Sequence, residues 1–218
     1  MCNSCCILTH CHSLLLYKKE KMKKETIQKG INYQDYRSMV AELMQENKTT
    51  GTKQTNELVE FTKLNEQRTN RNEKQFILSQ ELTDLFVNKS FNEFWIVFVE
   101  AWCGDCAQNL PAIYNIAKHA PGVELKILIK SENPEEMNNY LTAGAEAIPK
   151  LVRINKDSLE NIGTWGARPV NAQIIAEHWK KNKETIAKED FEKELHLWYA
   201  KNRSKDIQKE FWEMLTRQ

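Results

Sequence analysis

The spacing of apolar residues predicts helices in the first part of the chain. Apolar and aromatic side chains recur three and four residues apart over residues 33–44, which predicts an amphipathic helix. Thr55 is expected to start a second helix, whose apolar side is thin, at the surface of something larger. An apolar stripe over residues 76–87 predicts a third. We therefore expect a helical extension over residues 25–72, followed by the main domain.

The pattern then changes to short apolar runs. Residues 94–99 and 123–129 have the composition of buried strands, and a helical pattern over residues 105–119 separates them. Strand, helix and strand within this length form a parallel crossover unit. Residues 150–154 and 158–164 predict an antiparallel hairpin. The fold class is therefore α/β with a central mixed sheet.

Helical patterns return toward the C-terminus. Asn133 before Pro134 predicts a capped helix that runs to about Thr142. A stripe over residues 170–179 predicts a further helix that packs through its apolar side, and residues 183–218 predict a helical extension. The histidines of the body have no ligand partners at useful spacing, so we expect them to be structural or solvated: His119, His178 and His196.

Composition and charge narrow the classes of partner. The 218 residues are 41% hydrophobic and 28% charged, which suits a soluble globular chain with either one ordinary core and helical additions or two small domains. Lysine and arginine number 31 against 30 aspartate and glutamate, so no global field attracts nucleic acid or an anionic membrane. We expect neither as a partner.

Residues 1–24 form a separate segment. Its first dozen residues hold four of the six cysteines and two histidines: Cys2, Cys5, Cys6, Cys11, His10 and His12. They lack the paired spacing of a zinc site, so we favour a disordered tail, or a mis-annotated start with translation beginning at Met22. The segment has no basic start and too short an apolar run for a signal peptide or a membrane span, which predicts a cytoplasmic protein.

The other two cysteines, Cys103 and Cys106, stand between a predicted strand and a predicted helix. A pair with this spacing can bind zinc, form a structural disulfide or exchange electrons. A single pair supplies two of the four ligands of zinc, and the sequence has no second pair in its body, which makes zinc the weaker interpretation. A structural disulfide is uncommon in an intracellular chain.

Their place at the start of a helix favours the redox interpretation. Unpaired N–H groups and the positive end of the helix dipole stabilise a thiolate there. We expect Cys103, on the loop side, to be the nucleophile. Cys106, inside the helix, would then attack the mixed disulfide and release the reduced substrate.

The segment W-C-G-D-C resembles the active-site motif of the thioredoxin superfamily, W-C-G-P-C between a strand and a kinked helix. Four positions match and the fifth, Asp105, replaces the proline; the matching residues are Trp102, Cys103, Gly104 and Cys106. Pro111 stands where the family kinks its helix. The resemblance implies a three-layer fold with helices on both faces of the sheet.

Other motifs extend the resemblance along the chain. Ile148-Pro149-Lys150-Leu151 resembles the family's cis-proline loop, which offers a backbone edge to an extended substrate. With Asn65 and Arg68 in an Asn-x-x-Arg pair, and W-G-x-R-P at residues 165–169, the chain is similar to a bacterial branch of thioredoxin-like proteins with extra helices at both ends. This implies a thioredoxin-like domain over residues 73–182.

The resemblance also reveals a difference in the carboxylates. Thioredoxins carry a buried aspartate six residues before the nucleophile, for proton transfer to the second thiol, and this chain has Val97 there. We expect Glu100 to transfer this proton, or else either to face water at the strand edge or to cap a neighbouring backbone group. Asp105 either caps the helix or tunes Cys103, and it can do both.

The charge of Asp105 suggests the direction of electron transfer. A negative charge about 6 Å from the Cys103 sulfur costs a thiolate about 0.7 kcal/mol at the dielectric of water and about 2.8 kcal/mol at an effective value of about 20. We expect Asp105 near the surface, and therefore the lower figure. A less favourable thiolate disfavours the reduced form, which makes the pair a better reductant.

Several residues around the dithiol are expected to contact the substrate: Trp102, Gly104, Ile148, Pro149, Trp165 and Arg168. The resemblance places Trp165 and Arg168 in the loop beside the cis-proline. Arg168 would meet an acidic group of the partner or pair with Asp105. A structural role for Trp165 and Arg168 is the alternative.

The sequence thus predicts a cytoplasmic thiol–disulfide oxidoreductase, a reductant, without a bound cofactor. Its partners would be proteins or small molecules with disulfides, and a reductase or thiol system that regenerates the dithiol. The alternative is a thioredoxin-fold redox sensor or protein-binding module without turnover.

Overall fold

The computed structural model describes residues 21–217. The cysteines and histidines of the N-terminal segment, with the predictions of a disordered tail or a zinc site there, lie outside the described residues. Met22 is buried in the core, and its N–H donates to the Leu159 carbonyl at 3.0 Å.

The helices follow one another along the chain in this order: α1 (Lys24–Lys29), α2 (Tyr33–Gln45), α3 (Asn56–Gln75), α4 (Gln80–Asn88), α5 (Gly104–His119), η1 (Lys130–Glu132), α6 (Pro134–Met137), η2 (Asn138–Tyr140), α7 (Val170–Lys181), α8 (Lys188–Asn202) and α9 (Lys205–Thr216). Among these described residues, no helix combines the length and the apolar character needed to cross a membrane.

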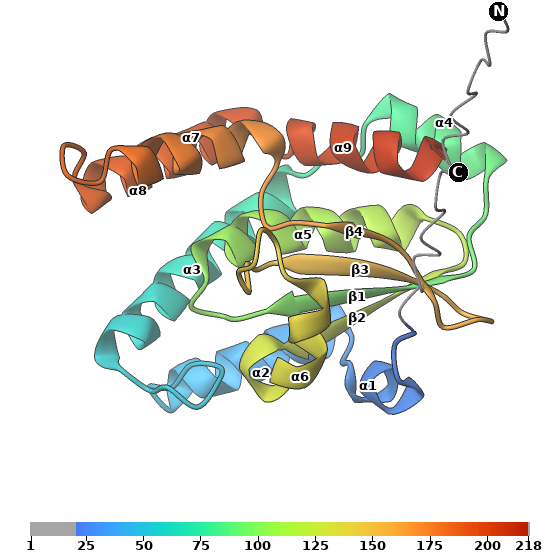
Figure 1. Ribbon diagram of the computed structural model, residues 1–218, viewed down its shortest axis with the longest axis horizontal. Coiled ribbons are helices and arrows are strands. Elements are labelled where there is room, and N and C mark those ends of the chain that lie inside the picture. The colour runs from blue at the N-terminus through green and yellow to red at the C-terminus, as the bar shows by residue number, and fades with distance from the viewer. Residues whose placement is uncertain (1–20, 218) are drawn as a thin grey trace, which may run out of the picture.

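Four strands form one mixed sheet in the order β2-β1-β3-β4 (Figure 1). β1 (Glu93–Val99) pairs in parallel with β2 (Val123–Ile129), as the crossover through α5 requires. β1 also pairs antiparallel with β3 (Lys150–Asn155), which continues into β4 (Asn161–Trp165). The predicted α/β class and the mixed sheet are therefore confirmed, although the last strand begins at residue 161, later than the 158 expected.

Helices cover both faces of this sheet. Because side chains alternate between the faces of a strand, Trp95 and Phe98 of β1 point in opposite directions. Trp95 packs against Phe211 of α9 with ring centroids 5.4 Å apart, and Phe98 lies 6.1 Å from the ring of Tyr140 in η2. Figure 1 shows α4 and α9 above the sheet and α1, α2 and α6 below it, which is the expected three-layer arrangement.

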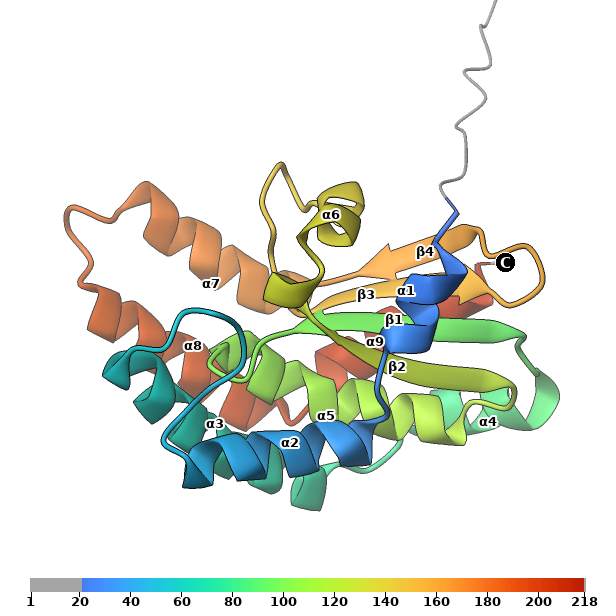
Figure 2. The ribbon, with the colours of Figure 1, turned by 90° about the horizontal axis from the view of Figure 1, so that it is seen from below.

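Helix α3 differs from the prediction in length and in setting. It continues through a polar stretch to Gln75 because its amides bond to the segment that carries the cysteines. Asn65 donates to the Ala101 carbonyl at 2.9 Å, and Asn72 donates to the Ala107 carbonyl at 3.1 Å. α3 therefore packs along α5 through polar groups (Figure 2), which hydrophobic periodicity cannot detect.

Two other helical predictions are corrected at their ends. The third helix begins after its N-cap Ser79, whose hydroxyl accepts from the Leu82 N–H, so residues 76–79 are not helical. The helix after Asn133 is one turn, α6, followed by the 3₁₀ turn η2. Asn133 makes no capping bond there, because its side-chain amide donates to the Ile129 carbonyl at 2.8 Å instead.

The packing face of α7 also differs from the predicted stripe. Val170 and Ile174 are 63% and 57% exposed, whereas Ala172 and Ala176 are buried. These alanines join Phe191 and other residues of α8 in a small second core. The α7–α8 pair thus forms a helical hairpin beside the sheet domain (Figure 2), and α8 contacts the first turns of α5 from there.

Candidate active site: the dithiol and its polar surroundings

Cys103 is the N-cap residue of α5 and is partly exposed. Its N–H donates to the Glu100 carbonyl at 3.1 Å, which fixes the turn between β1 and α5. Its thiol donates to the Ile148 carbonyl, with sulfur and oxygen 3.5 Å apart. The sulfur therefore lies between the positive end of a 16-residue helix and the loop before β3.

Cys106 lies one turn into α5 and is 2% exposed. Both thiols are free, and the Cys106 thiol is within hydrogen-bonding reach of Cys103. Burial raises the pKa of Cys106 well above its usual value, and the neighbouring Cys103 raises it further. Cys106 is thus held protonated beside the accessible sulfur, and the division between a nucleophile and a second thiol stays a prediction.

Asp105 is buried rather than near the surface, which corrects the sequence prediction. Its Oδ2 lies 2.5 Å from Nη2 of Arg168, and its Oδ1 accepts from the Tyr199 hydroxyl at 2.9 Å. Burial raises the pKa of Asp105, and Arg168 opposes this. The pairing of Arg168 with Asp105 was one of the two expected roles of this arginine.

The ion pair changes the electrostatic argument at Cys103. The sequence argument assigned Asp105 an uncompensated negative charge, but the guanidinium of Arg168 is close enough to interact with Cys103 as well. The two opposite charges largely cancel at the sulfur. The inference of a strong reductant therefore loses its electrostatic basis.

Two further side chains cover the start of α5 at Gly104. A Cβ atom at this position would lie 3.3 Å from Cε1 of His196 and 3.4 Å from Nη1 of Arg68. Arg68 donates to the Asn65 side chain at 2.8 Å, so the Asn-x-x-Arg pair orients this guanidinium over the active-site turn. Contact of Gly104 with a substrate stays a prediction, and these neighbours limit access on their side.

His196 gives the site a pH-dependent contribution to stability. Burial lowers its pKa from 6.5 to about 4, with help from the charges of Arg68 and Arg71. Between these values the unfolded chain binds a proton that the folded chain does not, so stability falls as pH falls from about 6.5 to about 4. We expect His196→Gln to reduce this loss by on the order of 1 kcal/mol, discounted because the side chain is partly exposed.

Urea unfolding of both proteins at about pH 7.5 and about pH 4.5 measures this difference. His119→Gln is the matched control, since His119 is exposed and contacts the backbone of its own helix at Asn115. An equal loss of stability in wild type and His196→Gln would contradict the prediction.

Glu100 does not face water. It is 0% exposed; its Oε2 accepts from the Thr50 hydroxyl at 2.5 Å, and its Oε1 accepts from the Ser131 N–H at 2.8 Å. It therefore caps a neighbouring backbone group, as one of the sequence interpretations expected, and does so inside the protein. Its role in proton transfer stays a prediction.

The residues expected at the substrate surface separate into two groups. Trp102 is partly exposed beside the dithiol, and the Ile148–Pro149 peptide bond is cis, as the resemblance implies. Ile148 offers its carbonyl to Cys103, although its side chain is buried. Trp165 is 8% exposed and donates to Glu210 of α9 at 2.6 Å, so the structural alternative holds for this residue.

Sequence reasoning missed the two residues that α8 brings to the site. Tyr199 bonds to Asp105 and also lies 3.0 Å from the side-chain amide of Asn109, while His196 lies above Gly104. Both follow the cysteines by about ninety residues, without a local motif that marks them. Among residues 21–217, no group of three or more histidine, cysteine or acidic side chains is arranged to hold a metal ion.

Comparisons with known proteins agree with this fold. A family model described as Thioredoxin matches residues 51–180, more than half of the chain. None of the curated proteins matches.

Two solved structures are similar. A protein of unknown function, PA1234, from Pseudomonas aeruginosa has 16% identity and a TM-score of 0.58, over 88% of this chain and 95% of that one. An HIV epitope-scaffold has 18% identity and a TM-score of 0.50, over 82% and 98%. These likenesses concern the fold, and the family match identifies the chain as a member of the thioredoxin family.

Proposed function

We propose that this protein is a thiol–disulfide oxidoreductase that uses Cys103 and Cys106. The observation that carries the proposal is the pairing of an accessible sulfur at the start of α5 with a buried thiol in contact with it. Disulfide exchange begins with attack by a thiolate, and the partly exposed N-cap position gives a substrate disulfide access to the Cys103 sulfur.

The reaction proceeds in two balanced exchanges. The Cys103 thiolate attacks one sulfur of the substrate disulfide, forms a mixed disulfide and expels the other sulfur as a thiolate, which takes a proton from solvent. Cys106 then loses its proton and attacks the Cys103 sulfur. The bond to the substrate breaks, and the second substrate thiol leaves. Two electrons pass from the dithiol to the substrate, and the protein retains the Cys103–Cys106 disulfide.

The surroundings of Cys103 support a polypeptide or small-molecule disulfide as substrate. Trp102 offers a partly exposed apolar surface, and the loop at Pro149 offers backbone groups beside the sulfur. The proposed chemistry needs no bound cofactor. A reductase or thiol system in the cytoplasm would return the disulfide to the dithiol. We also propose that the protein belongs to a bacterial branch of thioredoxin-like proteins with the same motifs.

Mixed-disulfide trapping tests the proposal directly. Cys106→Ser retains the nucleophile but cannot complete the second exchange, so we expect covalent complexes that dithiothreitol releases. Non-reducing gels and mass spectrometry of proteins bound to this variant measure them. Cys103→Ser, which keeps the buried thiol, is the matched control and should trap nothing. Equal trapping by the two variants would contradict the assignment of the nucleophile.

A further inference from the structure

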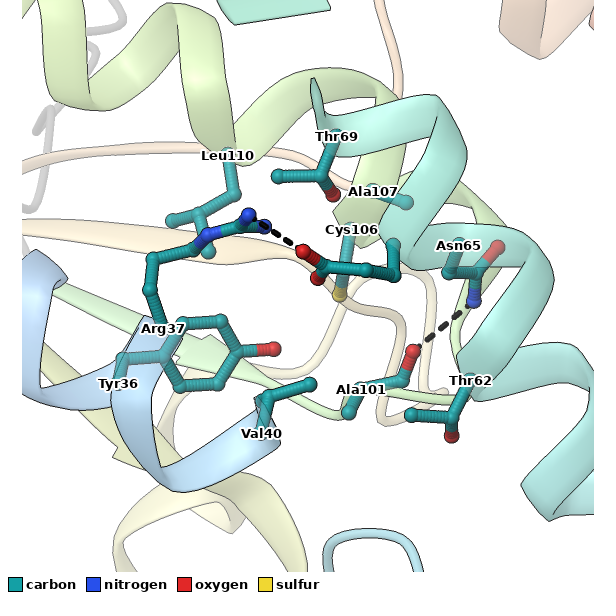
Figure 3. A pocket seen from close by; sticks show the side chains of 11 residues that line it. Tyr36, Arg37, Val40, Thr62, Asn65, Thr69, Ala101, Cys106, Ala107 and Leu110 are labelled. Atoms are coloured by element: carbon teal, nitrogen blue, oxygen red, sulfur yellow. Dashed lines mark hydrogen bonds and ion pairs between the residues drawn. The ribbon is translucent and has the colours of Figure 1, made fainter. Parts of the chain in front are cut away.

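A small polar pocket has Cys106 in its wall. It lies among α2, α3 and the start of α5, and Figure 3 shows the Cys106 sulfur directed toward its interior. Space for the centre of a water molecule amounts to about 20 Å³, enough for one. Polar lining groups, among them Tyr36, Thr69 and Asn65, give such a water hydrogen-bond partners.

Cys106 must give up its thiol proton to a group in or near this pocket during the second exchange. Its burial holds the proton in place, and the residue that thioredoxins use to receive it is replaced here by Val97. Among the residues that line the pocket, Glu66 is the one that carries a carboxyl group. Arg37 is a cation, and burial raises the pKa of Tyr36, which keeps its phenol protonated.

The contacts of Glu66 leave it able to accept. Its hydrogen bonds from Arg37 at 2.7 Å and Asn70 at 3.2 Å both end on Oε1, and within the described residues no bond is recorded on Oε2. The side chain is 23% exposed, so a proton received in the pocket can pass on to solvent. Arg37 fixes the carboxylate at the pocket wall through this ion pair.

We propose that Glu66, through one water in this pocket, is the proton acceptor for Cys106 when it resolves the mixed disulfide. The inference rests on the proposed oxidoreductase function and deepens it. The water takes the thiol proton and passes one to Glu66; the Cys106 thiolate forms the bond to Cys103 and the substrate leaves as a thiolate. Glu66 then releases its proton to solvent, and the departed substrate thiolate takes one from there.

Other ionisable groups also face the reacting thiol. Cys103 and Asp105 approach it from the start of α5 and Tyr36 approaches it from α2, whereas Glu100 contacts the thiol through its backbone and its charge acts on Tyr36. Glu100 is the competing acceptor, but both of its oxygens are already bonded and it does not line the pocket. Both oxygens of Asp105 are also bonded, one to Arg168 and the other to Tyr199. Glu66 faces Arg37, which also approaches Glu73 at 3.6 Å.

Stopped-flow reaction with 5,5′-dithiobis(2-nitrobenzoate) separates the two exchanges. Attack by Cys103 releases the first thionitrobenzoate, and attack by Cys106 releases the second. We expect Glu66→Gln to slow the second phase about 100-fold at neutral pH and to leave the first unchanged, because a general base contributes about that factor. The rate of its second phase should rise tenfold for each pH unit, since hydroxide must replace the lost base.

Glu73→Gln is the matched control. It removes a carboxylate from the same helix that also interacts with Arg37, but Glu73 does not line the pocket. It should leave both phases unchanged. If Glu66→Gln does not fold by circular dichroism, Glu66→Asp carries the test, with a smaller slowing of the second phase alone.

Three outcomes would overturn the inference: an unchanged second phase in the Glu66 variants, equal slowing by Glu73→Gln, or slowing confined to Glu100→Gln. In each, a normal first phase and thionitrobenzoate release would leave the oxidoreductase proposal intact. Absence of both phases in the wild type would overturn the proposed function and this inference with it.

Discussion

Replacing Cys103 with serine is expected to lower the rate of insulin-disulfide reduction by dithiothreitol to the uncatalysed level. The reason is chemical: a serine hydroxyl stays protonated at neutral pH and does not attack a disulfide sulfur, whereas the thiolate does. Cys106 cannot take over, because it is 2% exposed and its pKa is raised by burial. The turbidity of precipitating insulin chains measures the rate.

Cys106→Ser distinguishes the enzyme from a sensor in the same assay. This variant makes the first exchange but then depends on external thiol to free Cys103, so we expect slow residual turnover. An inactive wild type that still undergoes a reversible two-electron oxidation would favour the sensor and contradict the enzyme. Activity retained by Cys103→Ser would contradict the nucleophile itself.

The parts of this site that could be predicted from sequence are those that one local segment forms. An apolar run over residues 94–99, a change of periodicity and a cysteine pair specify a strand, a tight turn and a helix without knowledge of the rest. The cis bond at Pro149 could be expected because the family motif is contiguous there. Each of these features depends on neighbours within a few residues.

The environment of Asp105 could not be predicted, because distant elements create it. Its position in the motif suggested an exposed first-turn carboxylate, but Tyr199 of α8 and Arg168 enclose it. The same holds for α3, whose Asn65 and Asn72 look solvated in sequence and bond to α5 in the structure. The sequence alone does not distinguish a polar residue that bonds to a buried backbone group from one that faces water.

Trp165 illustrates the reverse error. An aromatic residue in a loop near an active site suggested a substrate contact, but α9 covers the ring and supplies Glu210 for its N–H. The placement of α9 depends on the contact between its apolar side and the sheet, where Phe211 of α9 packs against Trp95 of β1. A residue's local motif identifies its neighbourhood, and the long-range packing decides whether it is accessible.

The Asp105–Arg168 ion pair is expected to set the reduction potential of the dithiol. Asp105→Asn leaves the positive charge of Arg168 near Cys103, which stabilises the thiolate and hence the reduced form. We expect the potential to become more positive by about 30 mV, which corresponds to about 1.4 kcal/mol. Equilibration with glutathione buffers measures it.

Arg168→Met tests the same pair through stability. It leaves a carboxylate that is 10% exposed without its cation, which costs about 3 kcal/mol in the free energy of unfolding, the lower end for a buried pair because Arg168 itself is 21% exposed. Asp105→Asn should cost less, since the freed guanidinium can reach water. Urea unfolding measures both.

The double variant decides whether charge is the cause. Asp105→Asn with Arg168→Met removes both charges, so its potential should return toward that of wild type, and the two changes should be strongly non-additive. If the potential of the double variant stays as positive as that of Asp105→Asn, the shift arises from altered packing at the start of α5 and the electrostatic account is wrong. Because the two residues are in contact, this cycle isolates their interaction at the helix start where Cys103 reacts.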